Sequence, residues 1–115
     1  MRVGCPKEIK NHEYRVGLTP ESVRELVTRG HEVWIEAGAG LGIGATDDSY
    51  RGAGAKLVDG PDAIFAECEM VVKVKEPQAV ERAKLREGQV LYTYLHLAPD
   101  PEQPADLVKS GVTAI

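Results

Sequence analysis

Short apolar runs alternate with segments of helical period along the chain, and this alternation constrains the fold more than any other feature. Such a pattern predicts β-α units, whose strands pair in parallel. We therefore expect a Rossmann-like or flavodoxin-like α/β fold, with a mainly parallel sheet of about six strands flanked by helices. The expected strands lie at residues 2–5, 32–36, 56–58, 69–75, 89–95 and 112–115.

Helix signals occur between these runs. Thr19 and Pro20 suit the cap and the first position of a helix that Gly30 ends. Thr46 is placed to cap a short helix at 47–51. Further helices are expected at 60–67, at 78–86 and after Pro101, where a helix runs to Lys109. With 115 residues, the chain has room for one compact domain.

Charge and apolar content exclude several classes of protein. The chain has 14 Lys and Arg against 18 Asp and Glu, and its net charge is −4 without a basic stripe, which argues against nucleic-acid binding. No stretch approaches the roughly 18 apolar residues of a membrane span. Cys5 and Cys68 stand in apolar settings typical of buried thiols in a reducing compartment, without metal-ligand spacing. We expect a cytoplasmic protein that binds neither nucleic acid, membrane nor metal.

Polar residues follow three of the predicted strands. Ligands of open parallel sheets bind outside the carboxyl ends of the strands. Residues 7–15 follow the first strand, Lys75 ends the fourth, and His96 ends the fifth. Because these strand ends share one edge of the sheet, we expect their side chains to lie close together.

Three side chains at that edge are candidates for substrate chemistry. The guanidinium of Arg15 matches a carboxylate through two hydrogen bonds, and histidine is suited to proton transfer near neutral pH, which favours His96. Lys73 and Lys75 alternate with valines, which puts both lysines on one face of a strand. Each residue also has a plain structural interpretation: a surface arginine, a hydrogen-bonded histidine, or solvated lysines on an edge strand. Together, the trio of Arg15, Lys75 and His96 suits a 2-oxo acid that interconverts with a reduced 2-substituted acid.

A glycine-rich segment at 40–45 matches the pattern G-x-G-x-x-A of dinucleotide-binding turns. Its surroundings do not fit that function, because the helix that follows is short and contains Gly52 and Gly54. We expect instead a turn in which glycines adopt positive φ angles.

Six motifs stand out along the chain, at residues 2–10, 13–16, 18–20, 36–40, 72–77 and 92–98. They resemble the N-terminal part of alanine dehydrogenases, and the resemblance covers the whole chain. Some are shared in looser form with the alpha subunit of proton-translocating transhydrogenase, whereas the segment with His96 favours alanine dehydrogenase.

The resemblance implies an NAD-dependent enzyme that reversibly deaminates L-alanine to pyruvate and ammonium. It implies that Arg15 and Lys75 bind the substrate and that His96 and Lys75 are catalytic. It also implies a homohexamer whose NAD is bound by a separate Rossmann domain. Residues 1–115 would be an incomplete N-terminal substrate-binding domain that ends inside a strand, inactive alone and without the NAD-binding domain. The alternatives are the N-terminal domain of a transhydrogenase alpha subunit and a non-catalytic module that binds a small molecule.

Overall fold

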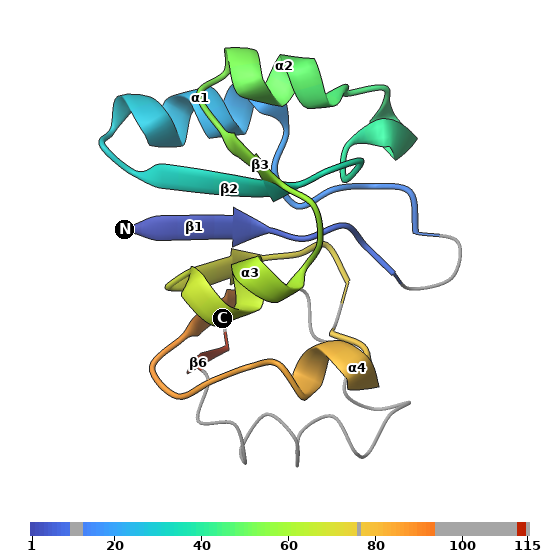
Figure 1. The fold of residues 1–115 in the computed structure, drawn as a ribbon, viewed down its shortest axis with the longest axis vertical. Coiled ribbons are helices and arrows are strands. Elements are labelled where there is room, and N and C mark those ends of the chain that lie inside the picture. Colours follow the sequence, from blue (N-terminus) through green and yellow to red (C-terminus); the bar gives the residue numbers. More distant parts are fainter. Residues whose placement is uncertain (10–12, 76, 94–112, 115) are drawn as a thin grey trace.

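A computed structural model describes residues 1–9, 13–75, 77–93 and 113–114. They form one six-stranded parallel sheet with the strand order β3-β2-β1-β4-β5-β6 (Figure 1). The predicted fold class is therefore confirmed. The strands are β1 (Arg2–Cys5), β2 (Glu32–Glu36), β3 (Lys56–Val58), β4 (Met70–Val72), β5 (Val90–Tyr92) and β6 (Thr113–Ala114).

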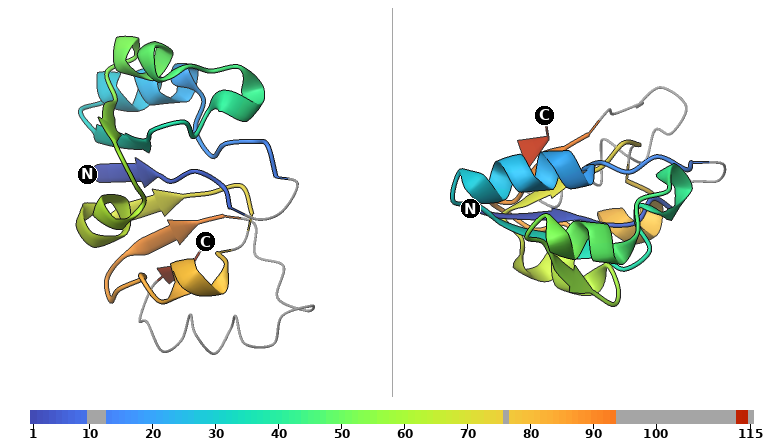
Figure 2. Two further views of the ribbon diagram at one scale, coloured as in Figure 1. Left: turned by 45° about the vertical axis from the view of Figure 1, so that its right-hand side comes forward. Right: turned by 90° about the horizontal axis from the view of Figure 1, so that it is seen from above.

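Helices cover both faces of this sheet. Figure 2 shows α1 and α3 on opposite sides of the strands. Thr19 caps α1 by accepting a hydrogen bond from the backbone N–H of Ser22, and Thr46 caps α2 in the same way through Ser49. The helices are α1 (Pro20–Thr28), the 3-10 helix η1 (Leu41–Ile43), α2 (Asp47–Gly52), α3 (Asp62–Glu67) and α4 (Ala79–Arg82).

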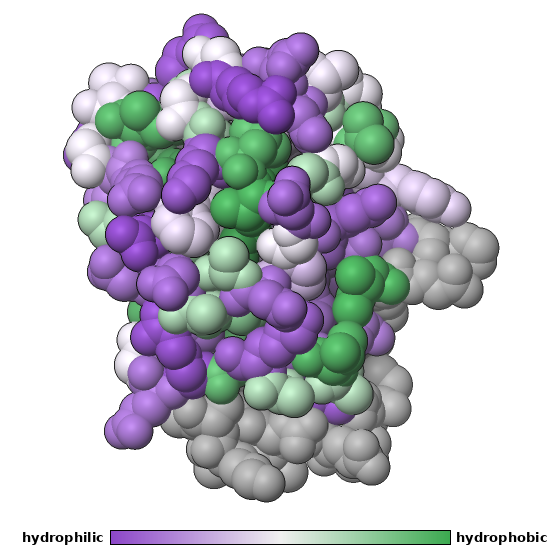
Figure 3. All heavy atoms as spheres, in the orientation of Figure 1, coloured by the Kyte–Doolittle hydropathy of each residue, from purple (hydrophilic) through white to green (hydrophobic). Residues whose placement is uncertain are grey.

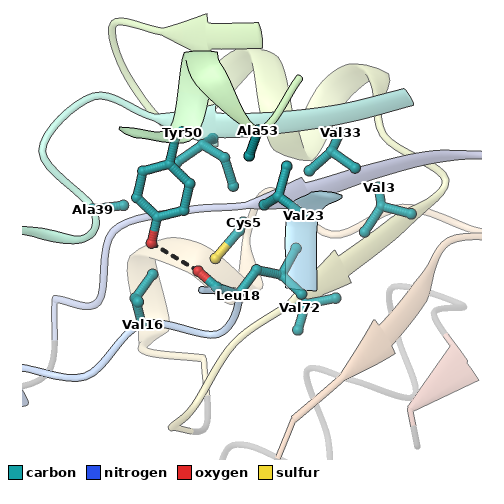
Figure 4. Close-up of a cluster of buried hydrophobic side chains, with 11 residues drawn as sticks. Val3, Cys5, Val16, Leu18, Val23, Val33, Ala39, Tyr50, Ala53 and Val72 are labelled. Atoms are coloured by element: carbon teal, nitrogen blue, oxygen red, sulfur yellow. Dashed lines mark hydrogen bonds between the residues drawn. The ribbon is translucent and has the colours of Figure 1, made fainter. Parts of the chain in front are cut away.

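Two apolar clusters lie on either side of the sheet because side chains alternate along each strand. Val33 and Ile35 of β2 point into the first cluster with α1 and α2, and Trp34 points into the second with α3. In the first cluster, the hydroxyl of Tyr50 donates a 2.7 Å hydrogen bond to the carbonyl of Leu18 (Figure 4). This bond ties α2 to the segment that leads into α1.

Gly4 of β1 faces the second cluster, and the packing there explains why this residue has no side chain. A Cβ atom at this position would lie 2.5 Å from Cγ2 of Ile64 and 2.7 Å from Sγ of Cys68. The glycine therefore allows α3 to pack closely against β1. Hydrophilic side chains cover most of the face seen in Figure 3, and its apolar side chains form small separate groups.

Two predicted elements are shorter in the structure. The strand expected at 69–75 ends at Val72, and the backbone N–H groups of Val74 and Lys75 donate to the side chain of Glu8 instead of a neighbouring strand. The helix expected at 78–86 ends at Arg82. The latter segment begins with a capping box between Gln78 and Glu81, but after one turn it leaves the helical conformation, and Gly88 has a positive φ of 81°. The strand expected at 89–95 spans Val90–Tyr92, and Thr93 is no longer part of it. Residues 94–95 and the helix expected up to Lys109 lie outside the described residues.

Candidate functional site

The loop that follows β1 carries a buried carboxylate to the end of β4. Glu8 is 7% exposed, and its Oε1 accepts a 3.0 Å hydrogen bond from Nζ of Lys73. Its Oε2 accepts a 3.0 Å bond from the backbone N–H of Val74, and Oε1 also accepts a 3.3 Å bond from that of Lys75. One carboxylate thus satisfies three donors from the end of β4.

Lys73 is the centre of a buried ion-pair cluster. Its ammonium lies 3.0 Å from Oε1 of Glu8 and 3.0 Å from Oε2 of Glu81, and all three side chains are 3% exposed or less. We call these three residues the Lys73 cluster. Because β4 lies between β1 and β5, the interpretation of Lys73 and Lys75 as solvated lysines on an edge strand is wrong. Charges this well buried are stable only when they are paired and hydrogen-bonded.

Lys75 lies beyond the end of β4, not within it, and it is half-buried. The predicted strand that would place Lys73 and Lys75 on one face is therefore wrong at its carboxyl end. Lys73 N–H still donates to the carbonyl of Tyr92 at 3.0 Å, as in a parallel ladder. Glu8 then takes the next two backbone donors, and this ends the strand.

Arg15 makes a two-point ion pair with Glu13. Its Nε donates to Oε2 at 3.0 Å and one terminal nitrogen donates to Oε1 at 2.9 Å. The side chain of Arg15 is 64% exposed, whereas that of Glu13 is 5% exposed. The hydrogen bonds from Arg15 are the main cause that lowers the pKa of Glu13 to about 2, and the positive charge of Lys75 adds to the effect. Glu13 and Arg15 therefore form one ion pair, on which the charge of Lys75 acts only weakly.

A pocket of about 290 Å³ opens beside this ion pair, and we call it the rim pocket. It lies at the carboxyl edge of the sheet, between the loop that follows β1 and the turn that follows β2. Acidic and basic groups share its wall with backbone from the glycine-rich turn. Its lining residues are Lys7, Glu8, Glu13, Tyr14, Arg15, Gly38, Ala39, Leu41 and Gly42.

The glycine-rich segment is a turn that closes one side of this pocket. Gly38 and Gly44 have φ angles of 81° and 78°, as the sequence predicted. A Cβ atom on Gly42 would lie 2.0 Å from the carbonyl oxygen of Tyr14, so this glycine admits the loop that carries Arg15. The turn leads into a 3-10 helix of three residues, which offers no helix N-terminus of the kind that binds pyrophosphate. The glycine-rich turn therefore does not fit the pyrophosphate of a dinucleotide.

Of the three predicted site residues, Arg15 lines the rim pocket and Lys75 does not. Lys75 follows the end of β4, and its positive charge is the smallest of the causes that shift the pKa of Glu13. The predicted proton-transfer residue His96 lies outside the described residues.

Glu8 and Glu13 were missed as individual site residues. The available signal was their place in the polar segment that directly follows β1.

Both cysteines are buried, as expected, and neither forms a disulfide. Burial raises the pKa of the Cys5 thiol to about 12 and that of Cys68 to about 11. Among the described residues, no group of His, Cys, Asp and Glu could hold a metal ion. In the same part of the chain, no helix is long and apolar enough to cross a membrane.

The parallel sheet and the charged pocket at its carboxyl edge define an open α/β domain of the kind that binds small ligands beside its strand ends. A family model described as "Alanine dehydrogenase/PNT, N-terminal domain" matches residues 4–115. The chain belongs to this family.

Known proteins of this family resemble the chain along its whole length. A curated alanine dehydrogenase from Halomonas elongata is 50% identical over 100% of this chain and 31% of the relative. A solved L-alanine dehydrogenase matches with a TM-score of 0.96 at 50% identity, over 100% of this chain and 32% of the other. A solved transhydrogenase from Sinorhizobium meliloti matches with a TM-score of 0.90 at 32% identity, over 99% of this chain and 34% of the other. The chain thus spans about a third of the length of these relatives.

Proposed function

We propose that the chain is the substrate-binding part of an NAD-dependent L-alanine dehydrogenase, which reversibly converts L-alanine to pyruvate and ammonium. The observation that carries this proposal is the 50% identity to alanine dehydrogenases over the whole chain. The charged groups at the carboxyl edge support it, because a small 2-oxo acid needs a cation for its carboxylate and a second donor for its carbonyl oxygen.

Arg15 is proposed to bind the substrate carboxylate. The guanidinium already holds the carboxylate of Glu13 through two hydrogen bonds of 3.0 and 2.9 Å, which is the geometry that a substrate carboxylate would adopt. The exposed side of Arg15 leaves room for this exchange of partners. Substrate binding would then displace Glu13 from at least one of its two bonds.

Lys75 is proposed to donate to the carbonyl oxygen of pyruvate and to stabilise its carboxylate. Its ammonium polarises the carbonyl group, so that ammonia can attack the carbonyl carbon. His96 is proposed to move protons as the carbinolamine forms and loses water, a role that suits the pKa of an imidazole. Both assignments come from the match of Lys75 and His96 to the family's motifs.

The NAD site is proposed to lie in a part of the protein outside these 115 residues. The glycine-rich turn does not form a dinucleotide site, and the relatives are about three times as long as this chain. We expect the 115-residue chain alone to form no NADH from L-alanine and NAD. We further propose that the intact enzyme is a cytoplasmic homohexamer, as is usual for the family.

The 32% identical transhydrogenase supports a second candidate, the N-terminal domain of a transhydrogenase alpha subunit. The two candidates differ in their substrate. An alanine dehydrogenase forms pyruvate and NADH from L-alanine, whereas a transhydrogenase moves hydride between two nicotinamide nucleotides and works with a membrane partner. A module that binds pyruvate without turnover is the third possibility, and it would fail both assays.

The test is a steady-state assay of the full-length protein with L-alanine and NAD, and with pyruvate, ammonium and NADH in reverse. We expect Arg15→Ala mainly to raise KM for pyruvate, because it removes a binding contact, and His96→Ala mainly to lower kcat. Absence of alanine-dependent NADH formation by the wild-type protein would refute the proposal. A near-normal kcat for His96→Ala would refute only the role of His96.

A further inference from the structure

The backbone of Lys75 is held from both sides by side chains of other segments. Its N–H donates to Oε1 of Glu8 at 3.3 Å, and its carbonyl accepts a 2.9 Å hydrogen bond from the hydroxyl of Thr93. Glu8 follows β1 and Thr93 follows β5. The residue at the end of β4 is therefore fixed by the loops of the two neighbouring strands.

Glu8 is itself a rigid partner. Its carboxylate is 2% exposed and is bonded to the ammonium of Lys73 and to the backbone of Val74. Lys73 is in turn bound by Glu81, whose other oxygen accepts a 2.9 Å bond from the backbone N–H of Gln78 at the start of α4. A buried carboxylate with this many charge-assisted bonds has little freedom to move.

Of the two hydrogen bonds to the backbone of Lys75, the one from Thr93 is the easier to remove without disturbing other interactions. Thr93 is half-buried, its hydroxyl donates a hydrogen bond to the backbone carbonyl of Lys75, and its side chain is uncharged. Valine has nearly the same shape as threonine and lacks only the hydroxyl donor. A Thr93→Val substitution therefore removes this bond with little change in packing.

We propose that Thr93 and Glu8 are positioning residues that fix the main chain of Lys75 and thereby set where its ammonium reaches into the site. The effect of Thr93 and Glu8 on turnover rests on the proposed function of Lys75. Their effect on the order of segment 73–75 is independent of that function. A bound group has to be placed within a fraction of an ångström to act well, so a small displacement of the backbone of Lys75 would reduce the rate.

The experiment compares full-length wild-type protein with T93V, T93S, K75A and the double variant T93V/K75A. Hydrogen exchange read by mass spectrometry reports the order of the peptide that contains residues 73–75. Steady-state kinetics with pyruvate report kcat/KM. Thr28→Val, an exposed threonine at the far end of α1, is the matched control for the substitution itself.

We expect T93V to speed exchange in the 73–75 peptide and to lower kcat/KM for pyruvate by between about threefold and tenfold, the range that one net hydrogen bond supports. T93S keeps the hydroxyl and should behave like the wild type. In the K75A background, T93V should have no further effect on kcat/KM, because the residue through which it acts is gone.

Three outcomes would overturn the positioning role: unchanged exchange in T93V, a T93S variant as impaired as T93V, or an equal loss on T93V substitution with and without Lys75. If K75A retains normal kinetics while T93V loosens the 73–75 peptide, the proposed function of Lys75 fails and the positioning of its backbone stands. The two ideas therefore fail separately.

Discussion

The two edges of the sheet carry similar charged residues but hold them in different ways. At the amino edge, Arg2 lies 3.4 Å from Glu32 and 3.7 Å from Glu67, and these side chains are 35% to 59% exposed. At the carboxyl edge, Lys73 lies 3.0 Å from each of its two carboxylates, and the three side chains are 3% exposed or less. Water screens the first set and is excluded from the second.

This difference indicates what each edge contributes. Exposed ion pairs add little to stability because solvent screens them and the side chains lose entropy. Buried pairs do not guarantee stability either, but they fix the position of every partner, since a separated charge would be left without water. The edge with the fixed charges is the one that carries the rim pocket, Arg15 and Lys75. The buried ion pairs therefore fix the positions of groups around the rim pocket.

The largest expected effect on stability comes from removing the cation of the Lys73 cluster at the carboxyl edge. Lys73→Met keeps the side-chain volume but leaves Glu8 and Glu81 without their cation, and we expect the free energy of unfolding to fall by about 3–5 kcal/mol. Urea denaturation measures this loss. A loss below about 1 kcal/mol would contradict the view that the Lys73 cluster is buried and tightly paired.

Alkaline pH tests one buried thiol near each edge of the sheet, because Cys5 ends β1 at the carboxyl edge and Cys68 precedes β4 at the amino edge. Burial raises the pKa of Cys5 from 9.0 to about 12, so the unfolded chain ionises this thiol first and stability falls as pH rises above 9. The expected loss from Cys5 is about 1 kcal/mol at pH 10. Cys68, whose pKa is raised to about 11, adds to it.

Urea midpoints between pH 8 and pH 10 measure this dependence. The variants Cys5→Ala and Cys68→Ala should each show a flatter decline with pH than the wild type, whatever their stability at pH 8. An unchanged slope in both variants would show that the thiols are already ionised or accessible in the folded protein.

Glu13→Gln probes the exposed part of the carboxyl edge. The neutral amide binds Arg15 more weakly than the carboxylate does, so a substrate carboxylate would compete with it more easily. We expect KM for pyruvate in the full-length enzyme to fall by about fivefold.

Glu25→Gln, which removes the same charge on α1, is the control and should leave KM unchanged. If KM rises in Glu13→Gln, Glu13 supports Arg15 in its binding position instead of competing with the substrate.

The smallest effect is expected at the amino edge. Arg2→Met retains an apolar stem beside the ring of Trp34, over which the guanidinium now lies at 4.8 Å, and removes two exposed ion pairs. We expect the free energy of unfolding to fall by less than about 1 kcal/mol. Urea denaturation at low and high salt checks this, and a loss as large as that of Lys73→Met would remove the distinction between the edges.

Elements with local signals were predictable from the sequence. The ranges of β1, β2 and β3 agree with the prediction, because each is a short apolar run bounded by turn residues. Thr19 and Thr46 marked the starts of α1 and α2 through their own capping bonds. These features depend on residues within a few positions of one another.

Features decided by distant residues were not predictable. The end of β4 depends on Glu8, which lies 66 positions before Val74 in the sequence. No local sequence pattern predicts a contact between residues so far apart. For the same reason, the alternation of lysines and valines predicted a strand that continues to Lys75, whereas β4 ends at Val72. The predicted strand order alone places Arg15 and Lys75 at one edge, whereas the hydrogen bond from Thr93 to Lys75 depends on the three-dimensional arrangement of β4 and β5.

The reach of Glu8 also has a consequence for synthesis of the chain on the ribosome. The carboxylate oxygens of Glu8 accept from donors that are synthesised 65 to 67 positions later, and the bond from Thr93 to Lys75 can form only after that. Closing such long loops is slow and costs chain entropy before any bond repays it. The nascent polypeptide can therefore complete β1, α1, β2 and the lining of the rim pocket early, while segment 73–75 is fixed only after residue 93 has left the exit tunnel. A translational pause before that point would hold a chain in which Glu8 and the backbone of Lys75 still lack these partners.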